Sequence, residues 1–264
     1  MSKKIRLDVL LVEKGYLESR QKAQTTIMSG LVYVNNQKVD KPGTAVAEDA
    51  VIEVRGNALK YVSRGGLKLE KAMQTWPIDL TDTICMDVGA STGGFTQCAL
   101  EKGASQVFAV DVGSGQLAPQ LVADSRVCNL EKTDIRLLRA EQLAAIPDFA
   151  ACDVSFISLR LVLPAIAALL SQTGEAVVLI KPQFEAGRSS VGRGGIVKDA
   201  KVHLRVLQEM VDTFHANGFL IGGMTVSPIT GGDGNVEFLA WLRRAGEEAV
   251  PNLEDLVKKA HLLK

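Results

Sequence analysis

Short apolar runs alternate with helical segments from residue 83 to the end of the chain. Continuous apolar runs of this kind are typical of parallel strands whose two faces are both covered. We expect buried strands at these runs: 83–88, 107–112, around 126–129, 149–154, 176–181, 219–226 and 236–241. Only a turn, residues 227–235, joins the last two, and such a short connection requires antiparallel pairing. The pattern predicts an α/β, doubly wound sheet of seven strands with an antiparallel last strand.

The first 60 residues follow a different pattern, with shorter elements. Leucines at helical spacing predict a first helix over residues 6–14, which Gly15 ends. Ser19 is the expected N-cap of a second helix that continues to about Ser29. A glycine follows that helix too, as it follows many helices.

Strand signals come after the two helices. Residues 31–34 and 37–39 alternate apolar and polar side chains, and Asn35-Asn36 between them is a hairpin turn signal. A strand at 51–54 closes the unit. The pattern predicts a small α+β domain, separate from the α/β domain that follows it.

Charge is distributed unevenly between these two domains. The formal net charge of the chain is zero, so contact with a nucleic acid needs a local basic patch. The domain over residues 1–60 carries ten basic and seven acidic side chains, and the domain over residues 61–264 is correspondingly acidic. Three extra positive charges favour an anionic partner such as RNA without identifying it.

The cysteines and the apolar content exclude several classes of protein. Cys85, Cys98, Cys128 and Cys152 form no CxxC pair and have no histidine cluster beside them, so we expect neither a disulfide framework nor a metal site. The N-terminal segment lacks the apolar core and cleavage site of a signal peptide. The longest purely apolar run, 161–170, is about half of what a membrane-spanning helix needs. These features predict a cytoplasmic protein with no membrane partner; they leave its oligomeric state open.

A glycine-rich turn, DVGASTGGFT, lies between the first strand of the α/β domain and a helix. Glycines let a backbone turn tightly and approach a ligand closely. The next strand ends about 20 residues later at an aspartate, whose carboxylate can accept hydrogen bonds from ribose hydroxyls. The third strand end should flank an adenine. The expected cofactor-binding residues are Asp87, Gly89, Ser91, Gly93, Gly94, Asp111, Glu131 and Asp134.

The spacing of this turn favours S-adenosylmethionine over a dinucleotide. The sequence reads DxGxxxGG and lacks the middle glycine of the dinucleotide fingerprint GxGxxG. Asp87 would repel a pyrophosphate, but it suits the cationic amino-acid end of S-adenosylmethionine. A glycine-rich turn that binds no ligand is the alternative.

Five motifs occur in order along the chain: SRGGLKL, DVGASTGGFT, DVSFISL, IKPQFE and GNVEF. Together they resemble the FtsJ-like ribose methyltransferases and, more closely, the TlyA family, described both as haemolysin A and as a ribosomal RNA 2'-O-methyltransferase. The segment RLDVLLVEKGYLESRQKAQTTIMSGLVYVNNQKV is similar to the S4-type RNA-binding domain of a small-subunit ribosomal protein. The resemblance implies a Rossmann-like methyltransferase sheet, S-adenosylmethionine as cofactor, a ribose 2'-hydroxyl as acceptor, and ribosomal RNA or ribosomal subunits as partners.

In FtsJ-like enzymes a Lys-Asp-Lys-Glu tetrad carries out the reaction, and the motifs place it on Lys68, Asp153, Lys181 and Glu237. Lys68 opens a helix, Asp153 and Lys181 end strands at the edge where α/β proteins bind ligands, and Glu237 falls within the last strand. We expect Lys181 to be the base or main orienting group, Asp153 to orient it, and the other two to hold the ribose. A lysine accepts a proton only when neutral, and its unperturbed pKa is about 10.4. A buried salt bridge without a catalytic role is the alternative.

The RNA-binding residues expected from the S4-type resemblance and from local basic clusters are Arg6, Arg20, Lys22, Lys38, Arg64, Arg188 and Arg193. Gln24 lies on the same helix as two of them. The glycine- and arginine-rich segment 188–199 is either a mobile lid that contacts phosphates or a solvated loop.

Four other functions are weighed against ribose methylation. Amino-group methylation of bases normally uses a proline-containing loop after the fourth strand, which here reads DVSF. Carbon methylation needs a cysteine, and alternation along the strand turns Cys152 away from Asp153. A membrane-active haemolysin would need a membrane-inserting amphipathic segment, and an RNA-binding protein without catalysis would not need the tetrad.

Overall fold

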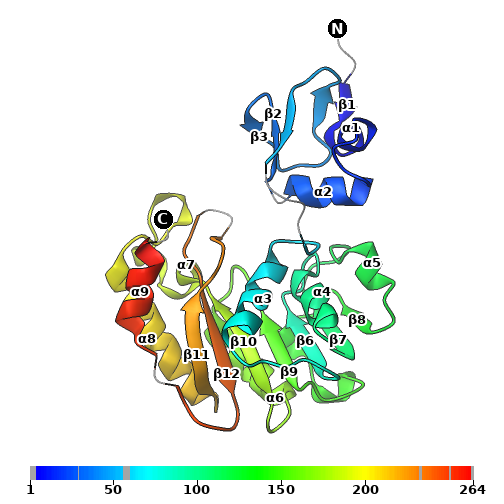
Figure 1. Ribbon diagram of the computed structural model, residues 1–264. Coiled ribbons are helices and arrows are strands. Elements are labelled where there is room, and N and C mark those ends of the chain that lie inside the picture. Colours follow the sequence, from blue (N-terminus) through cyan, green and yellow to red (C-terminus); the bar gives the residue numbers. More distant parts are fainter. Residues whose placement is uncertain (1–3, 29, 56–59, 232–233, 250, 263–264) are drawn as a thin grey trace. The chain divides into compact units, whose positions relative to one another are not determined.

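The computed structural model describes residues 4–28, 30–55, 60–231, 234–249 and 251–262. The chain divides into two compact units, Met1–Arg64 and Gly65–Lys264, which are described separately below (Figure 1). The division falls close to the predicted domain boundary after residue 60, and residues 56–59 lie outside the described part of the chain.

Unit 1 is a small α+β domain. Its elements are β1 (Lys4–Arg6), α1 (Leu7–Glu13), α2 (Arg20–Met28), β2 (Val32–Val34), β3 (Gln37–Lys38), β4 (Ala45–Ala47) and β5 (Ile52–Val54). Strand β1 pairs with β4, and β2 pairs with both β3 and β5, all antiparallel. Leu7, Leu10 and Leu11 of α1 pack with Ile27 of α2 and with the strands to form the core.

The structure confirms two local predictions in unit 1, a helix N-cap and a hairpin turn. The Lys22 N–H donates to Oγ of Ser19 at 3.2 Å, so Ser19 caps α2 as expected. Asn35 and Asn36 have φ values of +49° and +66°, which two-residue hairpin turns require. The end of the second helix at Ser29 lies outside the described residues.

The predicted start of the first helix was wrong. Residues Lys4–Arg6 form β1 and the helix begins at Leu7, because Ala45–Ala47 offers these residues a strand partner. A three-residue strand is too short to show the period of two that identifies strands.

Unit 2 is built on one sheet. Its strands are β6 (Ile84–Val88), β7 (Gln106–Val110), β8 (Val127–Leu130), β9 (Phe149–Cys152), β10 (Glu175–Ile180), β11 (Leu220–Val226) and β12 (Phe238–Arg243). In the described residues these seven strands lie in the order β11-β12-β10-β9-β6-β7-β8. Neighbours from β10 to β8 are parallel, whereas β12 is antiparallel to β10 and β11. The predicted seven-stranded α/β sheet with an antiparallel last strand is confirmed.

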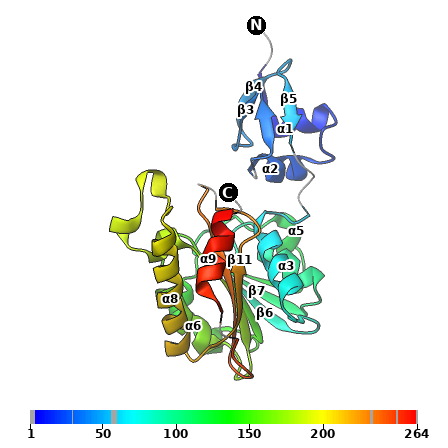
Figure 2. The same ribbon diagram turned by 60° about the vertical axis from the view of Figure 1, so that its left-hand side comes forward.

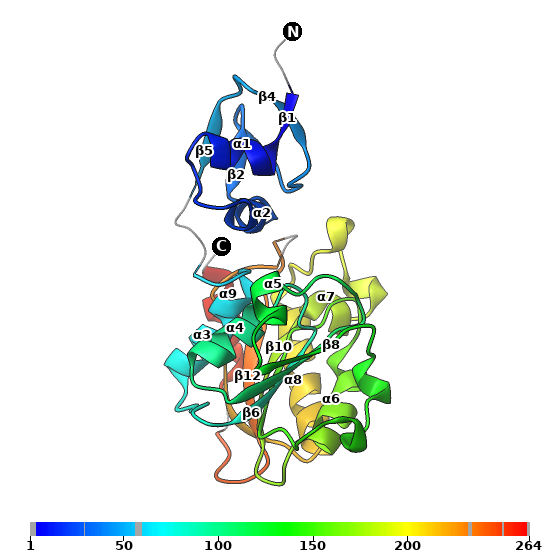
Figure 3. The ribbon, with the colours of Figure 1, turned by 90° about the vertical axis from the view of Figure 1, so that its right-hand side faces the viewer.

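Helices cover both faces of this sheet. They are α3 (Gly65–Thr75), α4 (Gly94–Glu101), α5 (Pro119–Val122), α6 (Leu159–Leu169), α7 (Pro182–Glu185), α8 (Ala200–Ala216) and α9 (Leu253–Leu262), with short 3-10 turns η1 (Ile135–Leu137), η2 (Ala140–Gln142), η3 (Arg188–Ser190) and η4 (Arg193–Gly195). Residues of α6, α8 and α9 form one core with one face of the sheet, and α8 and α9 lie side by side (Figure 2). Helices α3 and α4 lie on the opposite face (Figure 3).

This topology brings separate sequence motifs to one edge of the sheet. Because β6, β7, β8, β9 and β10 are parallel, the turns that follow them all open at their carboxyl ends. The motifs around Asp87, Asp153 and Lys181 therefore share that edge. Glu237 joins them from the opposite direction, because β12 is antiparallel and begins there.

Candidate active site

The four residues of the expected tetrad form one continuous chain of ion pairs. Nζ of Lys181 lies 2.6 Å from Oδ1 of Asp153, and Nζ of Lys68 lies 2.9 Å from Oδ2 of the same carboxylate. Nζ of Lys68 is also 2.9 Å from Oε2 of Glu237. The side chains of Lys68 and Lys181 are only 9% and 8% exposed. The four side chains are therefore in contact and largely out of water.

Four different elements supply this cluster. Lys68 lies in the first turn of α3, Asp153 directly follows β9, and Lys181 directly follows β10. Glu237 was expected within the last strand, but β12 begins one residue later, at Phe238. Its backbone carbonyl accepts a hydrogen bond from the N–H of Ser227, which fixes the start of the strand.

The carboxylates stabilise the charge on Lys68. Burial disfavours its ammonium, but Asp153 and Glu237 outweigh burial and raise the pKa of Lys68 above its ordinary value. Burial likewise opposes ionisation of Asp153, and the two lysines overcome it and lower the pKa of that carboxyl. Lys68 is therefore protonated and Asp153 ionised at neutral pH.

Lys181 has a second polar partner, which the sequence analysis did not identify. Its Nζ lies 2.8 Å from Oγ of Ser155, in the turn after β9. A hydroxyl can accept a hydrogen bond from an ammonium and can donate one to a neutral amine. Ser155 can therefore stay bonded to Lys181 in either protonation state.

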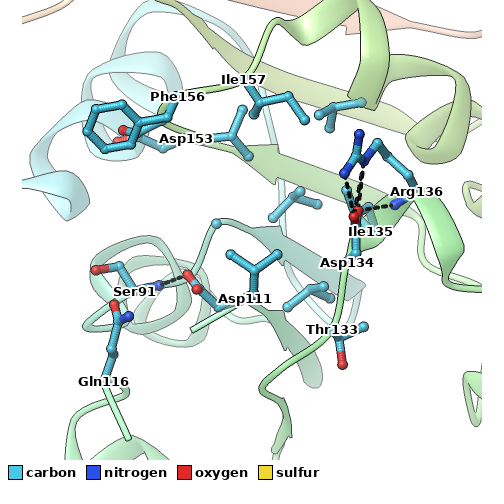
Figure 4. Close-up of a pocket in the computed structure, with 17 residues that line it drawn as sticks. Ser91, Asp111, Gln116, Thr133, Asp134, Ile135, Arg136, Asp153, Phe156 and Ile157 are labelled. Atoms are coloured by element: carbon cyan, nitrogen blue, oxygen red, sulfur yellow. Dashed lines mark hydrogen bonds and ion pairs between the residues drawn. The ribbon is translucent and has the colours of Figure 1, made fainter. Parts of the chain in front are cut away.

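A cavity of about 530 Å³ lies beside this cluster, at the carboxyl ends of the strands (Figure 4). Its walls come from the turns after β6, β7, β8 and β9, and Asp153 is part of the lining. Figure 4 shows Ser91 and Asp111 on one side and Phe156 and Ile157 on another, with Asp134 near Ile135. Small-molecule sites commonly have this volume and this mixture of apolar walls and a few carboxylates.

Gly89 allows the glycine-rich turn to approach the tetrad. Its φ is +84°, and a Cβ at this position would lie 2.7 Å from the backbone oxygen of Asp153. Any larger residue would push the turn away from Asp153. This glycine thus joins the wall of the cavity to the charged cluster.

The expected cofactor residues are only partly brought together. Gly89, Ser91, Asp111 and Asp134 line the cavity. Asp111 accepts hydrogen bonds from the N–H groups of Ser91 and Gly113, at 2.8 and 2.7 Å, which orients its carboxylate at the strand end.

Gly93, Gly94 and Glu131 are not part of the lining. Gly93 and Gly94 begin α4, behind the turn. Glu131 accepts a hydrogen bond from the N–H of Gly115 at 2.8 Å and so stabilises the loop after β7.

Asp87 also lies outside the cavity lining. It is buried inside β6, and its Oδ2 accepts hydrogen bonds from both the N–H and the hydroxyl of Thr96 in α4, at 2.8 and 2.7 Å. Burial raises the pKa of Asp87 to about 7, against the hydrogen bonds from Thr96. In this structure the carboxyl ties the start of α4 to β6.

The expected RNA-binding residues fall into separate groups. In unit 1, Arg6 and Arg20 both bond to Asp8, and Lys22 pairs with Glu18. Lys38 is exposed, and the end of its side chain occupies the space that a Cβ at Gly30 would fill. Arg64 is partly exposed near the start of α3.

Segment 188–199, expected to be either a mobile lid or a solvated loop, is held at several points. The side chain of Asn235 accepts a hydrogen bond from the N–H of Val197 at 3.0 Å and donates one to the oxygen of Gly195 at 2.9 Å. Arg205 of α8 donates to Oγ of Ser190 at 3.1 Å. Arg188 and Arg193 remain exposed on this segment.

Phe156 is a further residue that the sequence analysis did not single out. Its side chain is 92% exposed, it has a φ of +63°, and its ring lies 5.3 Å from the ring of Phe184. A bulky residue rarely adopts a positive φ, so a strained, exposed aromatic in the wall of this cavity indicates a function. The signal in the sequence was an aromatic residue in the polar turn DVSF.

The cavity fits S-adenosylmethionine by its donor set. The carboxylate of Asp111 at the end of β7 can accept hydrogen bonds from ribose hydroxyls, and Ile135 and Ile157 offer apolar surface to an adenine. Asp153 links this cavity directly to the buried lysines. A methyl carried by such a cofactor would thus be supplied next to the tetrad.

The described residues contain neither a membrane-spanning helix nor a cluster of metal-ligating side chains. No helix there is both long and apolar enough to cross a membrane. Nor do three or more His, Cys, Asp and Glu side chains of that part of the chain gather in a way that could hold a metal ion.

Comparison with known proteins gives the family. The family model described as FtsJ-like methyltransferase matches residues 61–244, and the S4 domain model matches residues 5–52. The 16S/23S rRNA (cytidine-2'-O)-methyltransferase TlyA of Mycobacterium tuberculosis is 40% identical, over 98% of both chains. Hemolysin A of Brachyspira hyodysenteriae is 43% identical, over 89% of this chain and 98% of its own.

The solved structure of a protein from Streptococcus thermophilus, described as a putative hemolysin, is similar to this one with a TM-score of 0.79 and 42% sequence identity. It covers 99% of this chain, and this chain covers 97% of it. The predicted resemblance to the FtsJ-like and TlyA proteins is thereby confirmed. The chain belongs to the FtsJ-like methyltransferase family, whose methyl donor is S-adenosylmethionine, and it carries an S4 domain at its N-terminal end.

Proposed function

We propose that this protein transfers a methyl group from S-adenosylmethionine to a ribose 2'-hydroxyl of ribosomal RNA. The observation that carries the proposal is the ion-pair chain Lys181–Asp153–Lys68–Glu237 beside the cavity. The relatives named as rRNA (cytidine-2'-O)-methyltransferases support ribosomal RNA as the substrate and a cytidine as the target. The S4 domain supports RNA contact outside the reaction centre. A ribosomal substrate supports a cytoplasmic location for the protein.

The residue types suit this reaction. A sulfonium methyl, which the bound cofactor supplies, is already a good electrophile. The protein's own task is to orient the 2'-hydroxyl and to remove its proton. Correct orientation of two reacting groups can lower the activation barrier by up to about 7–11 kcal/mol.

The two lysines have different tasks in this proposal. Two carboxylates hold Lys68 in its protonated form, so it is a fixed donor that orients the ribose oxygen and cannot be the base. Lys181 contacts one carboxylate and a hydroxyl, and it is the remaining candidate for accepting the proton. Asp153 positions both lysines, and Glu237 positions Lys68.

The test is methyl transfer to purified 30S and 50S ribosomal subunits from methyl-labelled S-adenosylmethionine. The labelled RNA is digested to nucleosides and the methylated product identified by mass spectrometry. We expect a 2'-O-methylated nucleoside, which disappears with Lys181→Met and persists with Lys102→Met, a change of an exposed lysine. A methylated base would contradict the proposed acceptor, and cofactor that fails to bind would contradict the proposed reaction.

A further inference from the structure

Four side chains of the S4 domain meet at the N-terminal ends of its two helices. Asp8, in the first turn of α1, is completely buried. Its Oδ1 accepts a hydrogen bond from Nε of Arg6 at 3.0 Å. Its Oδ2 accepts three: from Nη2 of Arg6 at 3.0 Å, from Nε of Arg20 at 2.9 Å and from Nε2 of Gln24 at 2.9 Å. The carboxylate thus accepts four hydrogen bonds from side chains of its own domain.

The two arginines, by contrast, still face water. Their side chains are 52% and 55% exposed. A guanidinium has five N–H donors, and these bonds use two on Arg6 and one on Arg20. Because Nη2 of Arg6 and Nε of Arg20 bond to the same oxygen of Asp8, the two guanidinium groups lie next to each other. Two adjacent guanidinium groups with donors left over suit an anion with several oxygens, such as a phosphate.

The charge of Asp8 offsets only part of the positive charge of the two arginines. Hydrogen bonds from Arg6 lower the pKa of Asp8 well below its usual range, with help from Gln24 and Arg20 and against the effect of burial. Asp8 is thus ionised, but its charge lies beneath two positive charges, and the trio keeps a net charge of +1. The surface that this group presents is cationic.

We propose that Asp8 is a positioning residue that, with Gln24, holds Arg6 and Arg20 as one clamp for a backbone phosphate of the RNA. The inference rests on the proposed function, because it takes ribosomal RNA as the ligand. Fixing long side chains before the ligand arrives removes much of the entropy that binding would otherwise cost. Lys22 and Lys38, which have no contact with Asp8, contribute independently of the clamp.

The first test is the arginine pair. Arg6→Gln, Arg20→Gln and the double variant of the full chain are measured for binding to purified 30S and 50S subunits. A clamp requires both arginines, so we expect the double variant to bind only slightly more weakly than either single variant. For the matched control pair Lys22→Gln and Lys38→Gln we expect the two losses to multiply. Losses that multiply for the arginines as well would overturn the inference.

The second test is Asp8→Asn, which keeps the shape of the side chain and adds one positive charge to the domain. If charge alone governs binding, this variant binds RNA more tightly and with a steeper salt dependence. We expect the opposite, roughly 5- to 50-fold weaker binding, because two arginine side chains must then be ordered by the RNA. Equal or tighter binding would overturn the inference.

A folding control accompanies these measurements. Amide hydrogen exchange over residues 7–13 and 20–28 shows whether α1 and α2 persist in Asp8→Asn; if they do not, the arginine pair alone decides. Failure of the unmodified protein to bind either subunit would overturn both this inference and the proposed function. If the unmodified protein binds a subunit but the affinity losses of Arg6→Gln and Arg20→Gln multiply in the double variant, only the clamp is overturned.

Discussion

Asp8 of the S4 domain and Asp153 of the methyltransferase domain each hold two cationic side chains, but opposite parts of the two groups face outward. At Asp8 the carboxylate is buried, and the arginines are about half exposed. At Asp153 the lysines are buried, and the carboxylate borders the cavity. Exposed guanidinium groups can contact the backbone of an RNA, whereas buried ammonium groups can act only on a group that enters the cavity.

The kind of cation differs as well, and the difference fits the two tasks. Arginine stays charged at every physiological pH and offers a planar fork of donors to a phosphate. Lysine can lose its proton when its surroundings allow it, so it can take part in proton transfer. A carboxylate between two cations thus favours binding in one domain and reaction in the other. Four predictions test this division.

The largest effect is expected from Lys181→Met, which keeps the length of the side chain and removes its amine. General base catalysis typically contributes about 10²- to 10⁴-fold to a rate, so methyl transfer should fall by that factor. Binding of ribosomal subunits should change by less than about twofold, since Lys181 is buried within the methyltransferase domain and forms no part of the S4 domain's clamp. A loss of tenfold or less in single-turnover rate would remove Lys181 from the role of base.

Asp153→Asn and Asp8→Asn should differ in their effect on stability. Removing Asp153 leaves buried ammonium groups without their shared partner, which costs about 3–5 kcal/mol of unfolding free energy. Removing the charge of Asp8 should cost about 1–3 kcal/mol, because exposed guanidinium groups regain water. Urea unfolding followed by tryptophan fluorescence reports the first, since Trp76 and Trp241 both lie in unit 2. Circular dichroism and hydrogen exchange of unit 1 report the effect of Asp8→Asn. Equal losses of unfolding free energy in the two variants would contradict the comparison.

Asp87 offers a third case, a buried carboxyl with no ion pair among the described residues. Its pKa is raised from 3.8 to about 7, so the folded protein holds a proton that the unfolded chain releases. Stability is therefore fully present below about pH 4 and is lost as the pH rises toward 7, by up to about 4 kcal/mol at 1.36 kcal/mol per unit. Asp87→Asn should lack this loss. Urea unfolding of both proteins between pH 4 and 8 tests it; parallel curves would contradict the assignment.

The smallest effects are expected from Lys22→Ala and Lys38→Ala. Both lysines are exposed, and neither bonds to Asp8, so each should weaken RNA binding by about two- to threefold. Each should also reduce the slope of log affinity against log salt by about one. Titrations at several salt concentrations measure both quantities. If either lysine variant lost as much RNA affinity as Arg6→Gln, the arginine clamp would contribute no more to binding than an ordinary surface lysine.

The fold was predictable because its signals are local. Apolar runs located the strands of unit 2, and the single turn before Asn235 showed that the last strand runs antiparallel. Ser19 and the pair Asn35-Asn36 marked a helix start and a hairpin from their own chemistry. The strands β1 and β4 were missed because three residues carry no detectable period.

The site was predictable only as a list of residues. Motif order brought together Lys68, Asp153, Lys181 and Glu237, but it could not show that Lys68 bonds to two carboxylates and Lys181 to one. Ser155 was invisible as a partner of Lys181, because their contact spans 26 residues of sequence.

Acidic residues near the expected sites were the hardest to interpret from sequence. Asp8 counted only as a negative charge in a basic domain, because its bonds to Arg20 and Gln24 depend on how α1 packs on α2. Asp87 was expected beside the cofactor, but the approach of α4 turns its carboxyl toward Thr96. In both cases the direction of a side chain depends on a neighbouring helix rather than on its own segment.

The most direct test of the account is to measure subunit affinity and single-turnover methylation rate at saturating protein for Asp8→Asn and Lys181→Met. The account predicts a crossed result. Asp8→Asn binds ribosomal subunits more weakly and methylates at the normal rate once bound, whereas Lys181→Met binds normally and does not methylate. If either variant changes affinity and bound-state rate together, the division between an exposed clamp and a buried reaction centre is wrong.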